Sequence, residues 1–471
     1  MPTHIKRRAL RACDGTALLV VLIVLLAIAA WSSSFVWLMN QQLTRAGARY
    51  RSAAALAVAE AGVHRALSIL EGVAPDAPLP GRTWRTEEYA ETIRLGSFDG
   101  QFTLALVDDS DGAIVVTSAG EVGGVARRLR ARVYLASPAQ LAALYGGSIV
   151  RLEGPPAAVF ILPYGGVDYP WVHIASGVGL WLAGADVAMN NPAVPFQAGR
   201  GPVDSPLEAQ AAAAPPDLEP IRVWLGRGAG VRLDRYSMQL TVDQLRAMGV
   251  NIDQIARASN RLPPVPEVDR AFYQSRAAGN TANADTNEAA GKYSGDDDLV
   301  RKRDSLYSQR EFDLLLNYLN RPNGLEALQG VIYVAGGAIL GEGRRLQIGD
   351  GALVTEGAIR LAKSSSLEVT HSAATRTLPG LITLDNGDLL VSHGATLRVH
   401  GLVYASQEFE AARDAHVIIA GSVLAKSSGF SFSNAGAIVI RYDPAVLGTP
   451  GLRVPVDAPV IAWVARWEEL P

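Results

Sequence analysis

One uninterrupted stretch near the N-terminus constrains this chain most. No proline occurs between Pro2 and Pro75, and residues 15 to about 71 are rich in alanine and leucine. Such a stretch predicts one continuous helix, about 85 Å long at about 1.5 Å per residue. Residues 16–39 are apolar and free of charge, whereas the second half alternates apolar and charged positions. The helix is therefore expected to lie half in a membrane and half outside it.

The apolar half is long enough to cross a bilayer. Residues 16–39 would span about 36 Å as a helix, more than the roughly 30 Å of a hydrocarbon core. Ser32, Ser33 and Ser34 are expected to donate hydrogen bonds to carbonyls of the preceding turn. A removed secretory signal would have a shorter apolar run that ends at a small-residue cleavage site, so we expect this helix to remain on the mature protein.

Charges around the span give the expected orientation. A basic leader favours a cytoplasmic N-terminus, and basic residues beyond the span weaken that argument. The leader residues are Lys6, Arg7, Arg8 and Arg11, and those beyond the span are Arg45, Arg49 and Arg51. We expect a single-pass cytoplasmic membrane protein with its body outside the cytoplasm.

Composition describes the rest of the chain. Of 471 residues, 46 are glycine and 26 proline, and only 19% are charged, which favours a β-rich body with many turns over a disordered one. The net charge of -3 does not point to nucleic acid. Cys13 is the one cysteine, so the body is held together by burial without disulfides.

The junction at Gly15 carries a family resemblance. A basic leader ends in Gly15, an apolar run follows (ALLVVLIVLLAIAA), and the helix ends near AEAG at residues 59–62. This pattern resembles the N-terminus of type IV pilin-like proteins, and the PilX-type minor pilins in particular. The resemblance implies that a prepilin peptidase cuts between Gly15 and Thr16. Most pilins carry a glutamate where this chain has Val20; PilX-type proteins and the K-type pseudopilins also lack it and are thought to sit at filament tips.

The outer half of the helix has two stripes at helical spacing. Leu56, Ala59, Val63, Leu67 and Leu70 are expected to pack on the chain's own head. A small-residue stripe is expected to pack against neighbouring subunits, because alanines permit close approach of helices. With Val20, the predicted filament-packing residues are Ala46, Tyr50, Ala53, Ala57 and Ala61.

The fold class expected is α+β with an all-β solenoid. Three strand-like runs, 97–107, 113–118 and 125–135, predict a small antiparallel head. Residues 330–443 contain short apolar strands separated by Gly and Asn/Asp turns, which favour a β-solenoid; a β-sandwich is the alternative. The end of this region, through Tyr442-Asp443-Pro444, also resembles the β-helical domain of many PilX-type proteins.

Six segments follow from these patterns. They are a cleaved leader (1–15), a transmembrane and stalk helix (16–72), a pilin-like head (73–140), a solenoid start with a proline-rich, partly helical insertion (141–325), a β-solenoid (326–445) and a C-terminal tail (446–471). Inside the insertion, 242–258 and 311–319 are predicted helices, with Thr241 and Gln244 as a capping box, and 277–298 is a predicted exposed loop.

The sequence contains none of three common catalytic and nucleotide-binding motifs. The sequence lacks GxxxxGK[ST], HExxH and GxSxG. Four side chains supply oxygen atoms at alternate positions, but a calcium loop would want a glycine where Glu288 stands, so a solvated loop is expected and calcium is the alternative. The four residues are Asn283, Asp285, Asn287 and Glu288. His371, His393, His400 and His416 are read as isolated surface histidines, and Arg128, Arg130 and Arg132 as a solvated strand face. No cofactor, no metal and no catalytic residue is predicted.

These features predict a structural, non-enzymatic subunit of a type IV pilus-like filament. A bulky solenoid suggests the tip or assembly initiation, with adhesion or ligand binding by the solenoid. The expected partners are other pilin-like subunits, the inner membrane and prepilin peptidase. An extracellular ligand or DNA is an alternative partner, although residues 330–471 carry 11 basic and 13 acidic side chains. A membrane-tethered β-helix enzyme acting on polysaccharide, using Asp385 and Asp388, is the rival.

Overall fold

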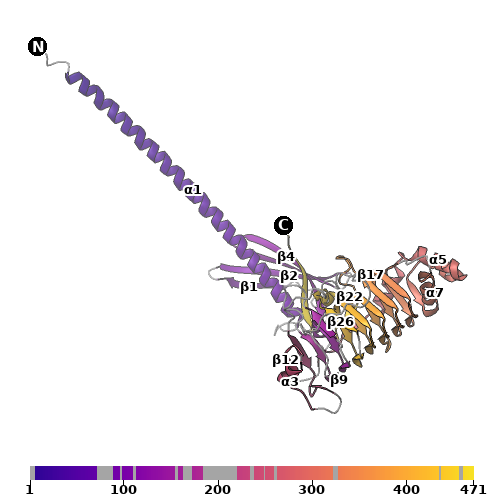
Figure 1. Ribbon diagram of the computed structural model, residues 1–471. Helices are drawn as coiled ribbons and strands as arrows, with labels where there is room; N and C mark the ends of the chain where they lie inside the picture. The colour runs from indigo at the N-terminus through magenta and orange to yellow at the C-terminus, as the bar shows by residue number, and fades with distance from the viewer. Residues whose placement is uncertain are drawn as a thin grey trace.

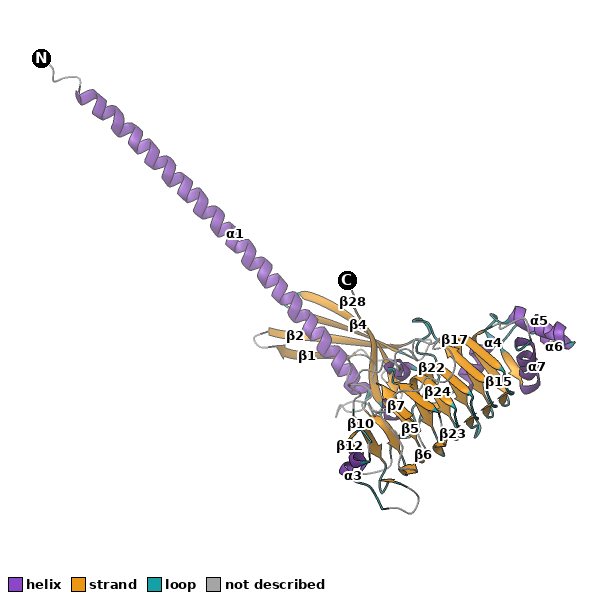
Figure 2. Cartoon of the chain, in the orientation of Figure 1, coloured by secondary structure: helices purple, strands orange, loops and turns teal. Residues whose placement is uncertain are grey.

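The computed structural model describes residues 6–71, 89–95, 98–109, 113–153, 158–162, 172–183, 220–233, 238–248, 250–258, 262–321, 327–433, 436–455 and 460–470. A long helix projects from a small head, and a stack of short strands lies beside the head (Figure 1). Strands form most of this body, and its short helices gather at the two ends of the stack (Figure 2). The α+β class with an all-β solenoid is confirmed.

The projecting helix, α1, runs without interruption from Lys6 to Leu70. The predicted end near residue 71 therefore agrees with the structure. The predicted start at residue 15 is wrong, because α1 already begins inside the leader. Residues 6–13 contain neither proline nor glycine, so nothing in the local sequence stops the helix from extending toward the N-terminus.

The head is an antiparallel sheet that covers one side of α1. Its described strands follow the order β1-β2-β3-β4-β28. The first four are β1 (Tyr89–Leu95), β2 (Phe98–Asp108), β3 (Ile114–Val122) and β4 (Val125–Ala136). The three predicted runs correspond to β2, β3 and β4, and β1 is an additional strand.

The fifth strand of the head comes from the other end of the sequence. β28 (Ile461–Leu470) pairs antiparallel with β4, from Ile461 opposite Ala136 to Leu470 opposite Arg128. The prediction of residues 446–471 as a tail is therefore wrong. Without β28, the edge of β4 would leave its backbone N–H and C=O groups without partners in the sheet, and a segment remote in sequence supplies them.

The solenoid is built from parallel strands in two sheets. The larger sheet follows the order β12-β10-β8-β5-β24-β22-β19-β17-β15-β14, with β20, β26 and β7 paired beside this path. Its strands are β5 (Ala142–Gly146), β7 (Ala158–Leu162), β8 (Val172–Ser176), β10 (Ile221–Leu225), β12 (Ile252–Arg257), β14 (Leu306–Ser308), β15 (Leu328–Ala335), β17 (Arg345–Thr355), β19 (Ser366–Thr370), β20 (Leu381–Thr383), β22 (Thr396–Ala405), β24 (His416–Ala425) and β26 (Ala437–Arg441). Because β17 and β22 each pair with both β19 and β20, the sheet wraps two sides of the stack.

The smaller sheet closes the third side of the solenoid. Its order is β11-β9-β6-β25-β23-β21-β18-β16. These strands are β6 (Ile149–Glu153), β9 (Gly179–Ala183), β11 (Gly230–Arg232), β16 (Ala338–Leu340), β18 (Ile359–Leu361), β21 (Leu389–Val391), β23 (Glu408–Ala411) and β25 (Gly429–Ser433). The parallel register of every pair in both sheets fits a solenoid and excludes the β-sandwich alternative for this region.

The stack is not built in the order of the sequence. The chain enters in the middle at β5 and proceeds to one end at β12. It restarts at the opposite end with β14 and β15 and returns until β24 pairs with β5, where Val423 lies opposite Leu144. Residues 141–325 are therefore not a simple insertion: they hold one end of the solenoid and the crossing to the other end.

The segment between β12 and β14, which crosses from one end of the stack to the other, runs along the outside of the stack. Tyr145 donates a hydrogen bond to the carbonyl of Pro263, and Ser137 Oγ donates to the carbonyl of Pro264 at 2.8 Å. A short antiparallel pair joins the crossing to the chain's last segment, formed by β13 (Glu267–Val268) and β27 (Leu452–Arg453). The crossing thus fastens the middle rungs while it connects the two ends.

The predicted helix 242–258 is only partly correct. α3 (Val242–Ala247) ends early, and Ile252–Arg257 forms β12 instead, where Ile255 pairs with Val223 of β10. The parallel ladder to β10 gives these residues backbone partners that override helix propensity. The capping box is confirmed, with Gln244 N donating to Thr241 Oγ1 at 3.3 Å.

The predicted loop 277–298 is wrong, because these residues belong to a helical cap. The cap consists of α4 (Arg270–Ala278), α5 (Ala284–Ser294), α6 (Asp297–Arg301) and α7 (Gln309–Leu319). Phe312, Leu315 and Leu316 of α7 are buried against the solenoid core. An uncovered last rung would expose apolar side chains and strand edges, and this cap covers them.

Candidate assembly interface

The second half of α1 is part of the head. One face of the helix joins the apolar side of the sheet, including Phe102, Val116 and Val133. The buried helix residues are Ala55, Val58, Ala59, Val63, Ala66 and Leu70. Their spacing of three or four residues defines one stripe, as the sequence predicts; Leu56 and Leu67 pack at its margin.

Two glycines set how closely the helix approaches the sheet. A Cβ on Gly120 of β3 would lie 2.3 Å from Ala55 O and 2.4 Å from Ala59 N, both backbone atoms of α1. A Cβ on Gly62 of α1 would lie 2.2 Å from Ser118 Oγ. The helix backbone therefore rests directly on β3. The sequence contains both glycines, but only the packed structure identifies them as contact points.

Polar contacts fix both ends of the packed half. Arg127 of β4 donates to Ser52 Oγ at 2.9 Å, at the start of the packed segment. Glu71, just after α1, accepts a hydrogen bond from Ala462 N of β28 at 3.0 Å. The packed half of α1 is thus tied to β4 and to β28.

The first half of α1 is exposed along residues 18–40. The helix segment Leu18–Leu70 is long and apolar enough to cross a membrane, with a mean hydropathy of 2.5 and 0% of its most apolar window buried. Trp31 is 84% exposed. Ser33 and Ser34 donate to Ala29 O and Ala30 O, each at 2.9 Å, as expected. This half is an apolar surface without a partner in the monomer.

The predicted packing residues are placed as follows. Val20 is exposed on the bare half, as are Ala46 and Tyr50 near its end. Ala53 and Ala57 are exposed on the side of α1 turned away from the head, and Ala61 is half-buried. Gly15 and Thr16 lie within the helical backbone, and their side chains are outside the described part of the structure. Their roles in cleavage and packing stay predictions.

The head and the solenoid meet in a buried polar joint. Gln140 follows β4 in the 3-10 helix η2 (Pro138–Leu141), and its Nε2 donates to Val446 O at 2.8 Å. Tyr442, after the last rung, donates to Gln140 O at 2.9 Å. Gly448 lets Tyr134 and Trp463 close over this joint. These contacts join the head directly to the C-terminal end of the solenoid.

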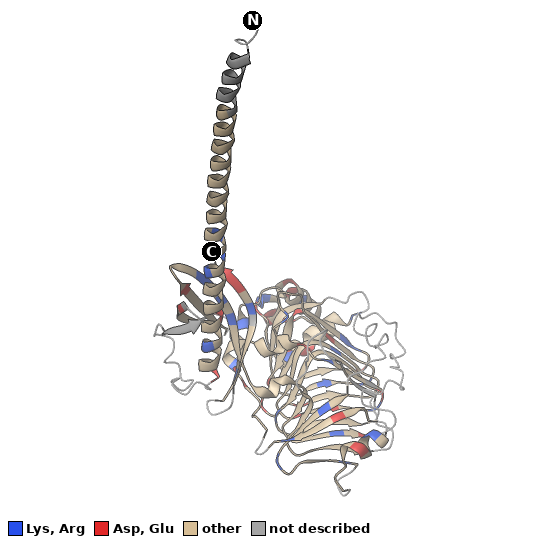
Figure 3. Ribbon diagram, turned by 90° about the vertical axis from the view of Figure 1, so that its left-hand side faces the viewer, with Lys and Arg blue, Asp and Glu red and all other residues tan. Residues whose placement is uncertain are grey.

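The outer face of the head sheet carries arginines. Arg128, Arg130 and Arg132 are spaced at alternate positions on β4, as predicted, and lie opposite residues of β28. Arg130 contacts Glu468 at 3.0 Å and Arg132 contacts Asp109 at 3.1 Å. Basic segments on the head strands beside the stalk are visible in Figure 3. The reading of these arginines as merely solvated is incomplete, since two of them are ion-paired.

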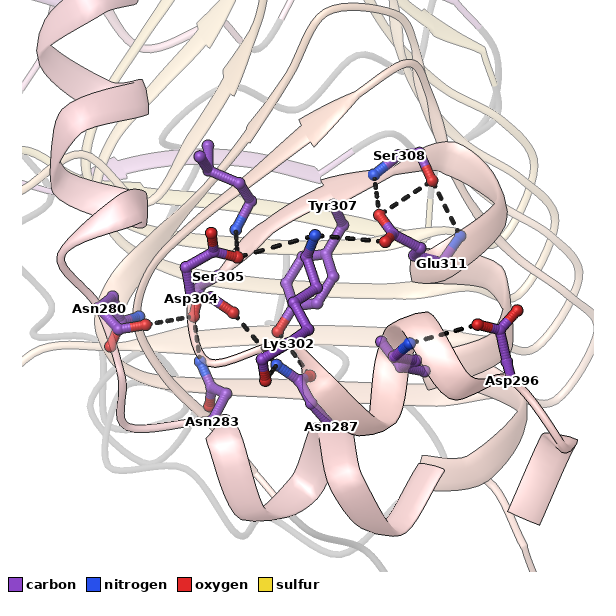
Figure 4. Close-up of polar contacts among 12 residues, drawn as sticks. Asn280, Asn283, Asn287, Asp296, Lys302, Asp304, Ser305, Tyr307, Ser308 and Glu311 are labelled. Atoms are coloured by element: carbon purple, nitrogen blue, oxygen red, sulfur yellow. Dashed lines mark hydrogen bonds and ion pairs between the residues drawn. The ribbon is translucent and has the colours of Figure 1, made fainter. Parts of the chain in front are cut away.

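The expected solvated loop at residues 283–288 is wrong, because these residues lie in and just before α5 and two of them are buried. Asn287 is buried in α5, and its Nδ2 donates to Asp304 O at 3.1 Å and to Lys302 O at 3.3 Å. Asn283 is also buried, and its Nδ2 donates to Ser305 Oγ at 2.9 Å (Figure 4). The two asparagines hold the loop before α7 instead of an ion. Among the residues that the structure describes, no group of three or more His, Cys, Asp or Glu side chains is arranged to hold a metal.

Two of the four histidines are not isolated. His400 Nδ1 accepts from His371 N at 3.5 Å, and His371 Nε2 lies 2.7 Å from Gly351 O. Burial lowers the pKa of both rings, so both are neutral near pH 7. His393 lies apart, near Asp414 at 3.5 Å. The solenoid therefore places His371 beside His400, although the two residues are far apart in the sequence.

The two carboxylates named for the enzyme rival have different surroundings. Asp385 occupies a left-handed turn conformation with a φ of 48° and forms an ion pair with Arg270. Asp388 lies one rung from Glu408, whose pKa is raised by burial and then by Glu410 and Asp388. Asp385 is therefore a turn residue whose charge is already paired.

Comparison with known proteins adds little to this geometry. This chain combines a long N-terminal helix, a small antiparallel head and a β-solenoid. No protein-family model matches it, and no curated protein does. Among solved structures, the competence-associated pilin ComZ from Thermus thermophilus aligns over 89% of this chain and 98% of that chain, at 14% identity and a TM-score of 0.25. A superposition that poor carries no argument about function.

Proposed function

We propose that this protein is a structural subunit of a type IV pilus-like filament, held in the cytoplasmic membrane by α1 before assembly. The observation that carries the proposal is the division of α1 at about Ser52. Its second half is packed closely on the head, whereas residues 18–39 of its first half are apolar and exposed. An apolar helix surface of this kind must be covered by lipid or by neighbouring helices. Filament assembly moves it from lipid into contact with the helices of other subunits.

The position and role within the filament are finer proposals. We place the subunit at the tip or in assembly initiation, as in PilX-type minor pilins, because Val20 offers no carboxylate and the solenoid is bulky. The N-terminus faces the cytoplasm and the body lies outside it. The solenoid acts by adhesion or ligand binding and not as an enzyme. The alternatives are a tip receptor for DNA and a tethered enzyme for polysaccharide.

Processing by a prepilin peptidase tests the proposal. The full chain is expressed with and without the peptidase, and the mature N-terminus is determined by mass spectrometry and N-terminal sequencing. We expect Thr16 as the first residue only when the peptidase is present. The Gly15→Val variant should remain uncut, and the matched Gly47→Val variant should be cut normally. An N-terminus elsewhere, or one independent of the peptidase, would remove the pilin assignment.

A further inference from the structure

The outer face of the head sheet, opposite α1, holds a shallow basic depression. Its volume is about 500 Å³. The lining residues are Val107, Asp109, Val115, Thr117, Arg130, Arg132, Arg466 and Glu468. Since α1 packs on the other face, membrane insertion or stalk packing leaves this depression uncovered. Val107 is 62% exposed at its floor, so the surface combines apolar and cationic groups.

A β-bulge places an arginine in this depression. The register of β28 against β4 shifts between Val464 and Arg466, so that Arg466 lies opposite Arg132. In unbroken register, Arg466 would lie opposite Ala131, which faces the core. A bulge redirects the side chains that follow it. Two arginines directly opposite each other repel, so the bulge creates an unfavourable pair that a bound anion would relieve.

The charged side chains of the depression form ion pairs with one another. Arg132 contacts Asp109, and Glu468 contacts both Arg130 at 3.0 Å and Arg466 at 3.6 Å. The lining thus holds three arginines and two carboxylates, so one positive charge is in excess. Arg132 is held from below, its guanidinium 5.8 Å from the centre of the Tyr134 ring.

We propose that this face binds an extended acidic peptide segment of a partner protein. Arg130 and Arg132 stand two residues apart on one strand, about 7 Å, which matches carboxylates at alternate positions of an extended peptide. Val107 and Val115 offer contacts to the apolar side chain between them. An acidic peptide with apolar residues between its carboxylates fits this mixed lining, whereas a nucleic-acid backbone offers no apolar group to Val107 and Val115.

Fluorescence anisotropy with the full chain in detergent tests the proposal. The probe is a labelled decapeptide with glutamate at every second position and valine between. Its controls are the same peptide with glutamine for glutamate, and a labelled DNA duplex. We expect saturable binding of the glutamate peptide alone, weakened by salt because the contacts are ionic.

Three variants locate the binding. Arg466→Gln should weaken binding of the glutamate peptide about tenfold, the loss expected for one charge-assisted contact. Glu468→Gln should strengthen peptide binding, since the substitution removes a carboxylate that competes with the peptide for the arginines. A purely structural role for Glu468 predicts no such gain. Arg413→Gln, on an exposed solenoid arginine, should change nothing. Thermal unfolding of each variant checks its folding.

The proposal is overturned by any of three results. The first is equal affinity for the glutamine peptide, and the second is weaker peptide binding by Glu468→Gln. The third is saturable DNA binding that Arg466→Gln abolishes while the glutamate peptide does not bind, which would assign the face to nucleic acid.

Discussion

At the scale of single residues, burial decides which side chains are neutral. His173 in β8 is fully buried, and its Nδ1 accepts from Arg222 N at 3.0 Å. Burial, and to a lesser extent the Arg222 charge, lower the pKa of His173 to about 4. The folded state therefore holds this ring neutral, whereas the unfolded chain protonates it near its ordinary pKa.

His173 should make stability depend on pH. Between about pH 4 and 6.5 the unfolded chain binds the proton and the folded chain does not, so unfolding is favoured as the pH falls. We expect a loss of about 3 kcal/mol across this range. Urea unfolding at pH 4.5 and pH 7 measures it. His173→Asn keeps an acceptor and should remove most of the difference; an unchanged pH dependence would contradict the assignment.

At the scale of elements, the joint between α1 and β3 depends on close backbone contact. No side chain separates the helix from the strand at Gly120, and the nearest atoms of α1 are backbone atoms that cannot rotate away. Gly47 lies in the bare half of the same helix, and a Cβ there would meet nothing within 4 Å. The same substitution should therefore act oppositely at the two positions.

Gly120→Ala should loosen the stalk from the head. Forcing a methyl group into this contact should cost about 1–3 kcal/mol or more, because the helix must move. Gly47→Ala should be neutral or stabilise by up to about 1 kcal/mol through helix propensity. Thermal unfolding and protease cleavage within the packed half of α1 measure both effects. Equal protease protection in the two variants would show that the contact does not hold the helix.

At the scale of the whole molecule, the C-terminal strand returns to the head, whereas the N-terminus lies at the far end of α1 (Figure 1). β28 completes the sheet that α1 packs on, and Trp463 on β28 packs against Gly448 and Tyr134 at the solenoid joint. The chain therefore returns from the solenoid to lock the head. Stalk, head and solenoid are expected to move as one body.

Truncation after Pro455 should release this lock. Without β28, the β4 amides that bond to it lose their partners and should exchange hydrogen faster, whereas amides in β18 and β21 of the solenoid should keep their protection. Hydrogen-exchange mass spectrometry measures both, and truncation after Leu470 is the matched control. Unchanged exchange in β4 would mean that β28 does not contribute to the head's stability.

Local signals in the sequence anticipated several elements well. The capping box predicted at Thr241 marks the start of α3, and the structure adds one at Ser308, which starts α7 two residues before the predicted 311. Asn283 and Asn287 misled, because a polar run indicates a solvated loop until the burial of these side chains is known. Asp385 in a turn likewise resembles a catalytic carboxylate until Arg270 is placed beside it.

The sequence by itself determined α1, its apolar half and the parallel-strand character of the body, because these depend on neighbours within a few residues. Tertiary structure alone decided that β28 pairs with β4, that β24 closes on β5 and that Arg466 faces Arg132. Such pairings join residues far apart in the chain, and the backbone hydrogen bonds that select them leave no periodic signal in the sequence.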